Sequence, residues 1–280
     1  MTQRPIDSIV IETGTNDLLA HVEDGVAVLT MNRPERRNAL SGEMLEALAR
    51  VLADCETNNA IAVVLLTGAG GAFCAGGDVK GMAAREGGSP REDIDAGIHR
   101  QRLSQRATAG RLYEMPKPTI AALPGAAAGA GLSLALACDL RIAAEGAVMT
   151  TAFAKVGFSG DYGGTFFLTR LVGAAKAREL YFLSERIEMA EAERLGLVNR
   201  VVPANALMTE ALALAKRLAS GPRVAYRYMK ENLNRAAGGA ALGECLDLEA
   251  THHIHTGLTE DHREAAQAFV EKRAPKFVGR

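Results

Sequence analysis

Apolar residues along the chain follow either an alternating or a continuous pattern. Residues 18–34 (LLAHVEDGVAVLTMNRP) alternate on both sides of the Asp24-Gly25 pair, which predicts a β-hairpin on an Asp-Gly turn. Residues 61–68 (IAVVLLTG) are almost entirely apolar and close with glycine, and residues 116–123 (PKPTIAAL) predict a further strand. A continuous apolar run is typical of a strand buried on both faces of a parallel sheet.

Helices are predicted where apolar residues recur every three or four positions. Ser41 is expected to cap a helix whose apolar face holds Met44, Leu45, Leu48, Val51 and Leu52. Short strands are expected over 139–144 and 147–152. Further helices are expected near 100–113, from 129 onward, and over 174–183, 190–195, 206–219, 224–233, 242–255 and 261–272. This order predicts an α/β fold, with a core over residues 1–204 and a C-terminal helical region over residues 205–280.

Composition argues against several classes of function. Of the 280 residues, 48% are hydrophobic and 23% are charged, so the chain can form a core with a solvated surface. The net charge of −1 argues against a nucleic-acid partner, because such proteins usually carry a basic excess. The four cysteines form no CxxC pair. They therefore indicate reduced thiols and a cytoplasmic location, with neither a zinc site nor a disulfide framework.

Residues 119–138 are uncharged and about long enough to cross a bilayer. Pro124 and Gly125 interrupt this segment, and alanine supplies much of its bulk. We therefore expect part of a protein core and no membrane partner. The opening residues, MTQRPIDSIV, carry charge where a signal peptide needs an apolar stretch, so no signal peptide is expected.

Several familiar sequence motifs are incomplete or absent in this chain. Gly129 begins a glycine-rich helix start, but Leu134 stands where a dinucleotide-binding loop needs its third small residue. The Gly-Lys-Ser/Thr of a phosphate-binding loop is absent from the sequence, and GFSGD is not a serine-hydrolase elbow. His252 and His255 could share a helix face near Glu249, but no fourth ligand is evident, so we expect no metal site.

Two glycine-rich segments follow predicted strands, over residues 65–82 (LLTGAGGAFCAGGDVKGM) and 123–139 (LPGAAAGAGLSLALACD). Each brings backbone N–H groups close to a ligand with few side chains in the way. A helix that begins near Gly129 also directs free N–H groups out of its first turn. Two such donors aimed at one oxygen would form an oxyanion hole. The alternative, that small residues only allow close helix–strand packing, remains open on spacing alone.

Six motifs, in order, resemble the crotonase superfamily, the enoyl-CoA hydratase/isomerase group. They are MNRPERRNAL, LLTGAGGAFCAGGDV, KPTIAALPGAAAGAGLSLALACDLRIA, AKVGFSGDYGGTFFLTRLVG, AERLGLVNRVV and AQAFVEKRAPKF. The resemblance runs from about residue 18 to 277 and implies the ClpP/crotonase spiral of ββα units. It also implies a C-terminal helical trimerisation region, a homotrimer or dimer of trimers, and an acyl-CoA thioester as substrate. Coenzyme A is then part of the substrate, and no further cofactor is expected.

The resemblance assigns roles to individual positions. It implies an oxyanion hole formed by the backbone N–H groups of Gly77 and Ala130. It places Ala75, Asp78, Arg33, Arg36 and Lys80 near the substrate or the coenzyme A phosphates. It also implies that Phe269 and Lys272 reach a neighbouring subunit's coenzyme A. The basic side chains suit phosphate, although each could instead be a solvated surface residue.

A hydratase of this group uses two glutamates, and those positions here hold Ser133 and Phe153. The acid that remains is Asp161, placed as in isomerases of the group, including the epoxyphenylacetyl-CoA isomerases. The resemblance implies that Asp161 takes a proton from C2 and returns it at C4. Burial among aromatic residues such as Tyr162 would raise the pKa of this carboxyl toward a working range. Asp161 could instead be an ordinary turn residue.

Two further functions remain open on the sequence. One is an enoyl-CoA hydratase of altered design, in which Asp161 and Ser133 manage the water. The other is a coenzyme A-binding scaffold that kept the fold and lost the chemistry. Ser133 could equally pack within its helix, and Tyr162 could contact substrate or line the pocket. The acyl group of the substrate does not follow from the sequence.

Overall fold

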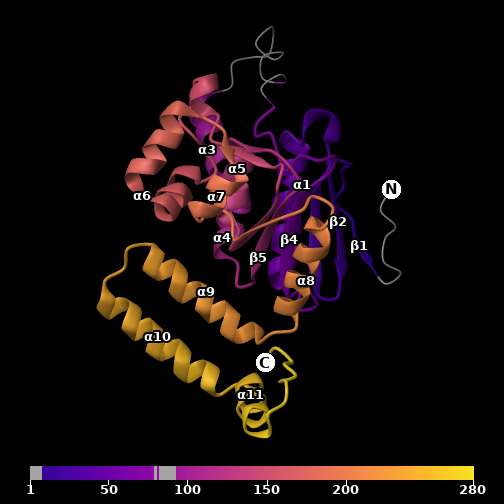
Figure 1. Ribbon diagram of the computed structural model, residues 1–280, viewed down its shortest axis with the longest axis vertical. Coiled ribbons are helices and arrows are strands. Elements are labelled where there is room, and N and C mark those ends of the chain that lie inside the picture. Colours follow the sequence, from indigo (N-terminus) through magenta and orange to yellow (C-terminus); the bar gives the residue numbers. More distant parts are fainter. Residues whose placement is uncertain (1–7, 79–80, 82–92) are drawn as a thin grey trace.

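A seven-stranded sheet forms the centre of the computed structural model, which describes residues 8–78, 81 and 93–280 (Figure 1). Its strands lie in the order β1-β2-β3-β4-β5-β7-β10. They span Ile9–Ile11, Leu18–Glu23, Val26–Met31, Val63–Gly68, Thr119–Leu123, Leu140–Ala144 and Arg200–Val202, respectively. The first three pair antiparallel, and every pairing from β3 onward is parallel. The predicted mixture of an N-terminal hairpin and parallel strands is therefore confirmed.

The hairpin turns where the sequence predicts it. Glu23 pairs with Val26 across a two-residue turn, in which Asp24 has φ 48° and Gly25 has φ 77°. Two left-handed residues form a type I′ turn, whose twist matches that of the flanking strands. Aspartate and glycine adopt this conformation at little cost, which is why the pair is informative in the sequence.

Helix α1 (Gly42–Thr57) begins at the predicted cap. The Ser41 hydroxyl accepts a hydrogen bond from the Met44 N–H at 3.0 Å, which satisfies one of the free donors of the first turn. The next helical stretch consists of α3 (Ile94–Gln105), a π-helical turn (Arg106–Gly110) and α4 (Arg111–Glu114). It includes the helix predicted near residues 100–113 and begins earlier. The apolar residues of α3, namely Ile94, Ile98 and Leu103, are exposed and form no buried face, so the sequence gives little sign of where this helix begins.

Each face of the large sheet carries its own layer of helices. On one face lies the larger apolar core, to which α1, α4, α5 (Ala130–Ala137) and α6 (Gly164–Leu183) contribute side chains, with α6 packed on α5. The other face is covered by α8 (Leu207–Ala219) through Leu207, Ala211, Ala215 and Ala219. The division between residues 204 and 205 remains a prediction, and the first helix beyond it packs on the sheet.

A three-stranded sheet, β6-β8-β9, lies beside the large one. Its strands are Ala127–Ala128, Val148–Thr150 and Ile187–Glu188, and α7 (Met189–Arg194) follows the last of them. Single turns of 3-10 helix span Pro34–Arg36 and Phe153–Val156. Helix α6 begins ten residues before the predicted 174–183 helix and breaks at Gly173, where φ is 78° and ψ is 164°. The glycines in its first half obscure the helical repeat.

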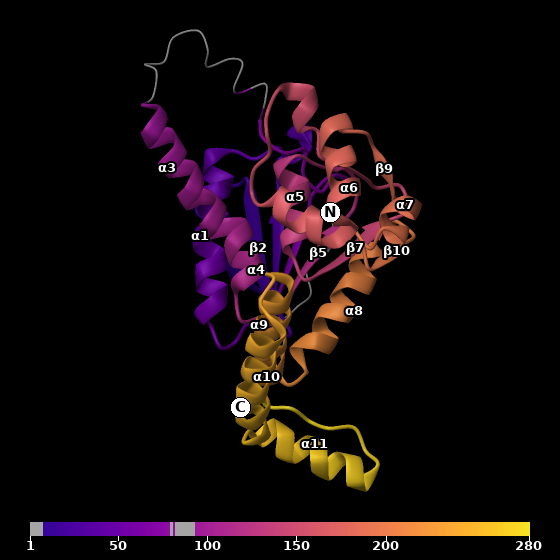
Figure 2. The same cartoon turned by 90° about the vertical axis from the view of Figure 1, so that its left-hand side faces the viewer.

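The last three helices, α9 (Arg223–Ala237), α10 (Leu242–Gly257) and α11 (Glu260–Glu271), extend away from the sheets (Figures 1 and 2). Several of their apolar side chains are exposed, among them Leu233 at 69%, Leu242 at 75% and Phe269 at 85%. In α9 the buried side chain is Lys230, whose ammonium pairs with Asp139 at 2.9 Å. The helical arm, which consists of α9, α10 and α11, therefore buries far fewer apolar side chains than α8 does.

Residues 119–138 are divided among β5, β6 and α5 rather than forming one helix. Across residues 8–78, 81 and 93–280, no helix has the length and apolar character needed to cross a bilayer.

Candidate active site

The two glycine-rich segments meet beyond the ends of β4 and β5. Gly76 lies directly against the turn that precedes α5, because a Cβ added to it would stand 2.8 Å from the Ala128 oxygen and 3.4 Å from the Ala130 nitrogen. Gly76 also has φ 89°, which disfavours any side chain. Glycine is therefore required here both by close approach and by backbone conformation.

The N–H groups of Gly77 and Ala130 are available at this junction. Among the residues that the structure describes, neither N–H has a hydrogen-bond acceptor. Ala130 is the first residue of α5, which has no side-chain cap. The neighbouring backbone is anchored, since the Leu40 N–H donates to Gly76 O at 2.8 Å and the Ala128 N–H donates to Cys74 O at 2.9 Å. Two free amides in a fixed setting can stabilise negative charge on an oxygen.

Asp161 lies in a tight loop between the 3-10 turn at Phe153–Val156 and the start of α6. Its Oδ1 is buried and accepts no hydrogen bond from the described residues. Burial alone raises the pKa of this carboxyl from 3.8 to about 6. Burial is the main reason that the pKa values of Cys74, Tyr162 and Tyr181 are raised, and the charge of Asp161 adds to each shift. The end of the same loop packs on α5, because a Cβ added to Gly164 would collide with the Ser133 hydroxyl. The loop therefore lies beside the helix that begins with Ala130.

The two positions that hold glutamates in hydratases are filled without acids. Ser133 is 1% exposed, and its hydroxyl donates to the Gly129 carbonyl at 3.3 Å within α5. The Phe153 ring stacks on the Tyr181 ring with centroids 5.8 Å apart. A Cβ added to Gly164 would collide with the hydroxyls of both Ser133 and Tyr181, so these two hydroxyls lie close together beside the start of α6.

Tyr162, a predicted substrate contact, is 4% exposed and bonds to α3 instead. Its N–H donates to Gln105 Oε1 at 2.6 Å, and its hydroxyl lies 3.2 Å from the Ser104 hydroxyl. Sequence reasoning missed both partners. Ser104 and Gln105 are adjacent at the end of α3, a helix without a buried face, so the sequence gives no sign that they point toward a partner.

The predicted coenzyme A contacts after β3 form an ion-pair cluster. The Arg33 guanidinium lies 3.2 Å from Asp78 and 3.5 Å from Asp17. The Gly81 N–H and then Arg33 hold the pKa of Asp78 below its usual range. Arg36 is exposed beside them. Arg33 therefore already has two acidic partners, which leaves Arg36 as the more available cation.

Three other predicted contacts lie elsewhere. The Ala75 N–H donates to Arg37 O at 2.9 Å, which fixes the segment before Gly76. Lys80 lies outside the described residues. Phe269 and Lys272 are on or just after α11, at the far end of the helical arm (Figure 2). Within one chain, the structure does not bring them together with Asp161.

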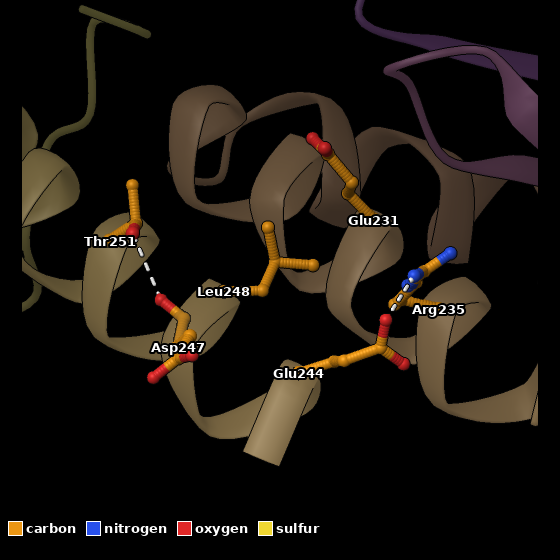
Figure 3. A pocket seen from close by; sticks show the side chains of 6 residues that line it. All are labelled: Glu231, Arg235, Glu244, Asp247, Leu248 and Thr251. Atoms are coloured by element: carbon orange, nitrogen blue, oxygen red, sulfur yellow. Dashed lines mark hydrogen bonds and ion pairs between the residues drawn. The ribbon is translucent and has the colours of Figure 1, made fainter. Parts of the chain in front are cut away.

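A separate pocket lies between α9 and α10 (Figure 3). It is lined by Glu231, Arg235, Glu244, Asp247, Leu248 and Thr251, and Arg235 pairs with Glu244 at 3.0 Å. Nearby, the His252 ring stacks on Tyr228 with centroids 4.2 Å apart, and its Nδ1 lies 2.6 Å from the Asn232 side-chain oxygen. In the part of the chain that the structure describes, no group of three ligands is placed to hold a metal ion.

Comparison with known proteins decides the family. The sequence pattern of the family described as "Enoyl-CoA hydratase/isomerase" matches residues 21–280. The chain belongs to the enoyl-CoA hydratase/isomerase family. The predicted family membership is thus confirmed, and the chain is an enzyme of the crotonase type.

Relatives and solved structures agree with this assignment. The chain is 39% identical over 263 residues to "1,2-epoxyphenylacetyl-CoA isomerase" of Escherichia coli (strain K12), covering 94% of this chain and 98% of the relative. It is 38% identical over 259 residues to "Probable enoyl-CoA hydratase" of Rhodobacter capsulatus, covering 92% and 96%. The crystal structure of an enoyl-CoA hydratase from Polaromonas sp. JS666 superposes with a TM-score of 0.86 at 36% identity, covering 93% of this chain and 99% of that one. The predicted crotonase fold is confirmed.

Proposed function

We propose that this enzyme is an enoyl-CoA isomerase. It would act on an acyl-CoA thioester and move a C3–C4 double bond into conjugation, or carry out the related rearrangement of a ring epoxide. The observation that carries the proposal is the buried Oδ1 of Asp161, which has no hydrogen-bond partner among the described residues. Its loop lies beside α5, the helix that begins with the free amide of Ala130, near the free amide of Gly77. The relative named 1,2-epoxyphenylacetyl-CoA isomerase supports an isomerase reaction.

In this mechanism the thioester oxygen accepts hydrogen bonds from the amides of Gly77 and Ala130. The ionised Asp161 takes a proton from C2, and the electron pair moves onto the thioester oxygen as a dienolate forms. The protonated Asp161 then returns the proton at C4, so the product has the mass of the substrate. Each amide donor contributes roughly 3 kcal/mol to lowering the barrier, because it acts on charge that develops only along the reaction.

The electrostatics of the loop suit a single carboxyl that acts first as a base and then as an acid. A pKa of about 6 leaves Asp161 mostly ionised at neutral pH, yet basic enough to accept a carbon-bound proton. The pKa values of Cys74, Tyr162 and Tyr181 are all raised, so these neighbours stay neutral at that pH. Asp161 is then the group that changes charge.

The isomerase accounts for the site better than a hydratase of altered design. Hydration needs one group to deprotonate water and a proton source for C2. Phe153 supplies neither, and the Ser133 hydroxyl is engaged with its own helix. A scaffold that only binds coenzyme A would need no buried, unpaired carboxylate.

Binding of coenzyme A is proposed to involve Arg36 and Lys80, with Arg33, Asp78 and Ala75 shaping the loop. Phe269 and Lys272 would then serve a neighbouring subunit in a homotrimer or a dimer of trimers. The exposed apolar side chains of the helical arm support such an assembly, since large exposed apolar surface is typical of interfaces.

The test uses purified enzyme with 3-enoyl-CoA and 2-enoyl-CoA substrates, followed by absorbance and mass. We expect conjugated thioester to form from the 3-enoyl substrate at unchanged mass. We also expect the Asp161→Asn variant to lose about 10²- to 10⁴-fold in kcat. A gain of one water from the 2-enoyl substrate would indicate the hydratase instead. No turnover above a boiled control would indicate the scaffold, and full activity of the variant would refute the role of Asp161.

A further inference from the structure

The direction of the Asp161 side chain is set by its backbone. Its Oδ1 is buried and has no hydrogen-bond partner among the described residues, so side-chain bonds do not hold the carboxylate at that oxygen. A carboxyl that serves both C2 and C4 must nevertheless stay in one place, because small displacements from a reacting atom reduce rates steeply. The elements that fix the Asp161 backbone therefore decide whether the carboxyl can act.

This backbone is held in a conformation that the sequence does not favour. Gly160 and Gly163 have φ values of 114° and 76°, which glycine adopts readily. Between them, Tyr162 has φ 49°, in the left-handed region that a bulky side chain avoids. Such a residue keeps its conformation only when its surroundings impose it, and this kind of strain is concentrated at functional sites.

The peptide group between Asp161 and Tyr162 is anchored at both ends. Its carbonyl, that of Asp161, accepts a hydrogen bond from the Gly164 N–H at 3.1 Å at the start of α6. Its N–H, that of Tyr162, donates to Gln105 Oε1 at 2.6 Å. With both ends held, the plane of this peptide cannot rotate. The ψ of Asp161 and the φ of Tyr162 are then fixed, and so is the Cα–Cβ direction of Asp161.

We propose that Gln105 is a positioning residue for Asp161, which it directs toward the substrate by accepting the Tyr162 N–H. The inference rests on the proposed function, in which Asp161 is the acid and base. Among the described residues, no hydrogen bond joins Gln105 to the Asp161 carboxylate. Gln105 acts through the peptide group, across 57 residues of sequence.

The end of α3 is built to present this acceptor. Gln105 is the last residue of α3, and the π-helical turn Arg106–Gly110 follows at once. A π-helical turn shifts the residues that follow it around the helix axis, and it occurs often at functional sites. Inside the turn, the Thr108 hydroxyl donates to the Ser104 carbonyl at 2.7 Å. Ser104 in turn lies 3.2 Å from the Tyr162 hydroxyl, so the same tyrosine is held at its backbone and at its ring.

Two substitutions separate the acceptor from the bulk of the side chain. Gln105→Met keeps the length and removes the acceptor, whereas Gln105→Glu keeps an acceptor oxygen. The matched control is Gln267→Met in α11, which replaces an exposed glutamine that bonds only to Glu271 among the described residues. The readouts are kcat and KM with the 3-enoyl substrate from pH 4.5 to 8.5, together with Tm.

We expect Gln105→Met to lower kcat by about 10- to 100-fold while KM changes by less than about 3-fold. We expect the acidic limb of the pH profile of kcat near pH 6 in the parent enzyme. In Gln105→Met this limb should move to lower pH as the released carboxyl gains water. The titratable groups on which Asp161 acts, namely Cys74, Tyr162 and Tyr181, are neutral over this limb. Gln105→Glu should keep kcat within about 3-fold of the parent at its pH optimum and should not move the limb downward.

If Gln105→Met has a lower Tm but the acidic limb of its kcat–pH profile does not shift, Gln105 has a purely structural role and the inference is overturned. Parent-like kcat in Gln105→Met, or a kcat loss in Gln105→Glu as large as in Gln105→Met, would overturn it as well. If the proposed function itself is wrong, Asp161→Asn remains active, and this result distinguishes it from a failure of the positioning role alone. If Asp161→Asn is inactive while Gln105→Met is unaffected, only the positioning role is lost.

Discussion

The two parts of the candidate active site are held in place in opposite ways. The free amides of Gly77 and Ala130 are positioned by backbone contacts between segments that have almost no side chains. The Asp161 carboxylate is positioned by a strained loop whose N–H is held by Gln105 from a distant helix. The first part depends on glycines that lack a Cβ, and the second on the two hydrogen bonds that hold the peptide group between Asp161 and Tyr162. Different substitutions should therefore disable each part.

The first prediction concerns a methyl group added at the glycine junction, where a large loss of kcat is expected. In Gly76→Ala, the new Cβ would stand 2.8 Å from the Ala128 oxygen at a φ of 89°. The segments must then move apart, and we expect kcat to fall by at least about 10²-fold, as when an oxyanion donor is lost. Steady-state kinetics and urea unfolding measure the two consequences.

The control for this substitution is Gly71→Ala. Gly71 has a similar φ of 78°, but its added Cβ meets nothing within 4 Å. It should lose about 1 kcal/mol of stability from backbone strain and keep its kcat. Equal kcat losses in the two variants would mean that backbone strain, and not the close approach at Gly76, determines the activity.

The second prediction concerns the cost of burying Asp161. Its pKa is raised in the folded state, so the folded protein binds more protons than the unfolded chain between about pH 4 and 6. Stability contributed by this group is therefore lost as pH rises through that window. Asp161→Asn should match the parent near pH 4 and be more stable by about 2 kcal/mol at pH 7, a value reduced for partial exposure.

Urea unfolding of both proteins at several pH values measures this difference. Asp54→Asn, at an exposed position of α1, is the matched control and should give no such pH-dependent gain. If Asp161→Asn is less stable than the parent at pH 7, the carboxylate is stabilised by its surroundings and burial does not dominate. If Asp161→Asn is more stable than the parent at pH 7 and also has a lower kcat, then Asp161 lowers the stability of the loop and is needed for activity.

The smallest effect is expected at Ser133, between the two parts of the site. Its hydroxyl bonds only to the Gly129 carbonyl among the described residues, a local helical bond of little net value. Ser133→Ala should therefore change kcat by less than about 3-fold and stability by less than about 1 kcal/mol. A loss of more than about tenfold in kcat would place the hydroxyl in the chemistry and favour a water-using reaction.

Much of the fold was predictable because its signals are local. The Asp24-Gly25 turn and the Ser41 cap each depend on residues at most three positions apart, and the structure has both. The two glycine-rich segments were also identified from the sequence, because runs of glycine indicate places where backbone segments can approach one another closely. The first half of α6 was missed because the glycines at its two ends, Gly163, Gly164 and Gly173, resemble loop residues, and the helix does break at Gly173.

The sequence by itself determined the α/β class, the helical arm, the family, and Asp161 as the acid at the matched position. Those features follow from periodicity, turn chemistry and ordered motifs, which are properties of neighbouring residues. Only the tertiary structure decided that Asp161 Oδ1 is buried without a partner among the described residues and that Gln105 accepts the hydrogen bond of the next N–H. Burial and hydrogen bonds between distant segments exist only once the chain has packed, so no local pattern encodes them.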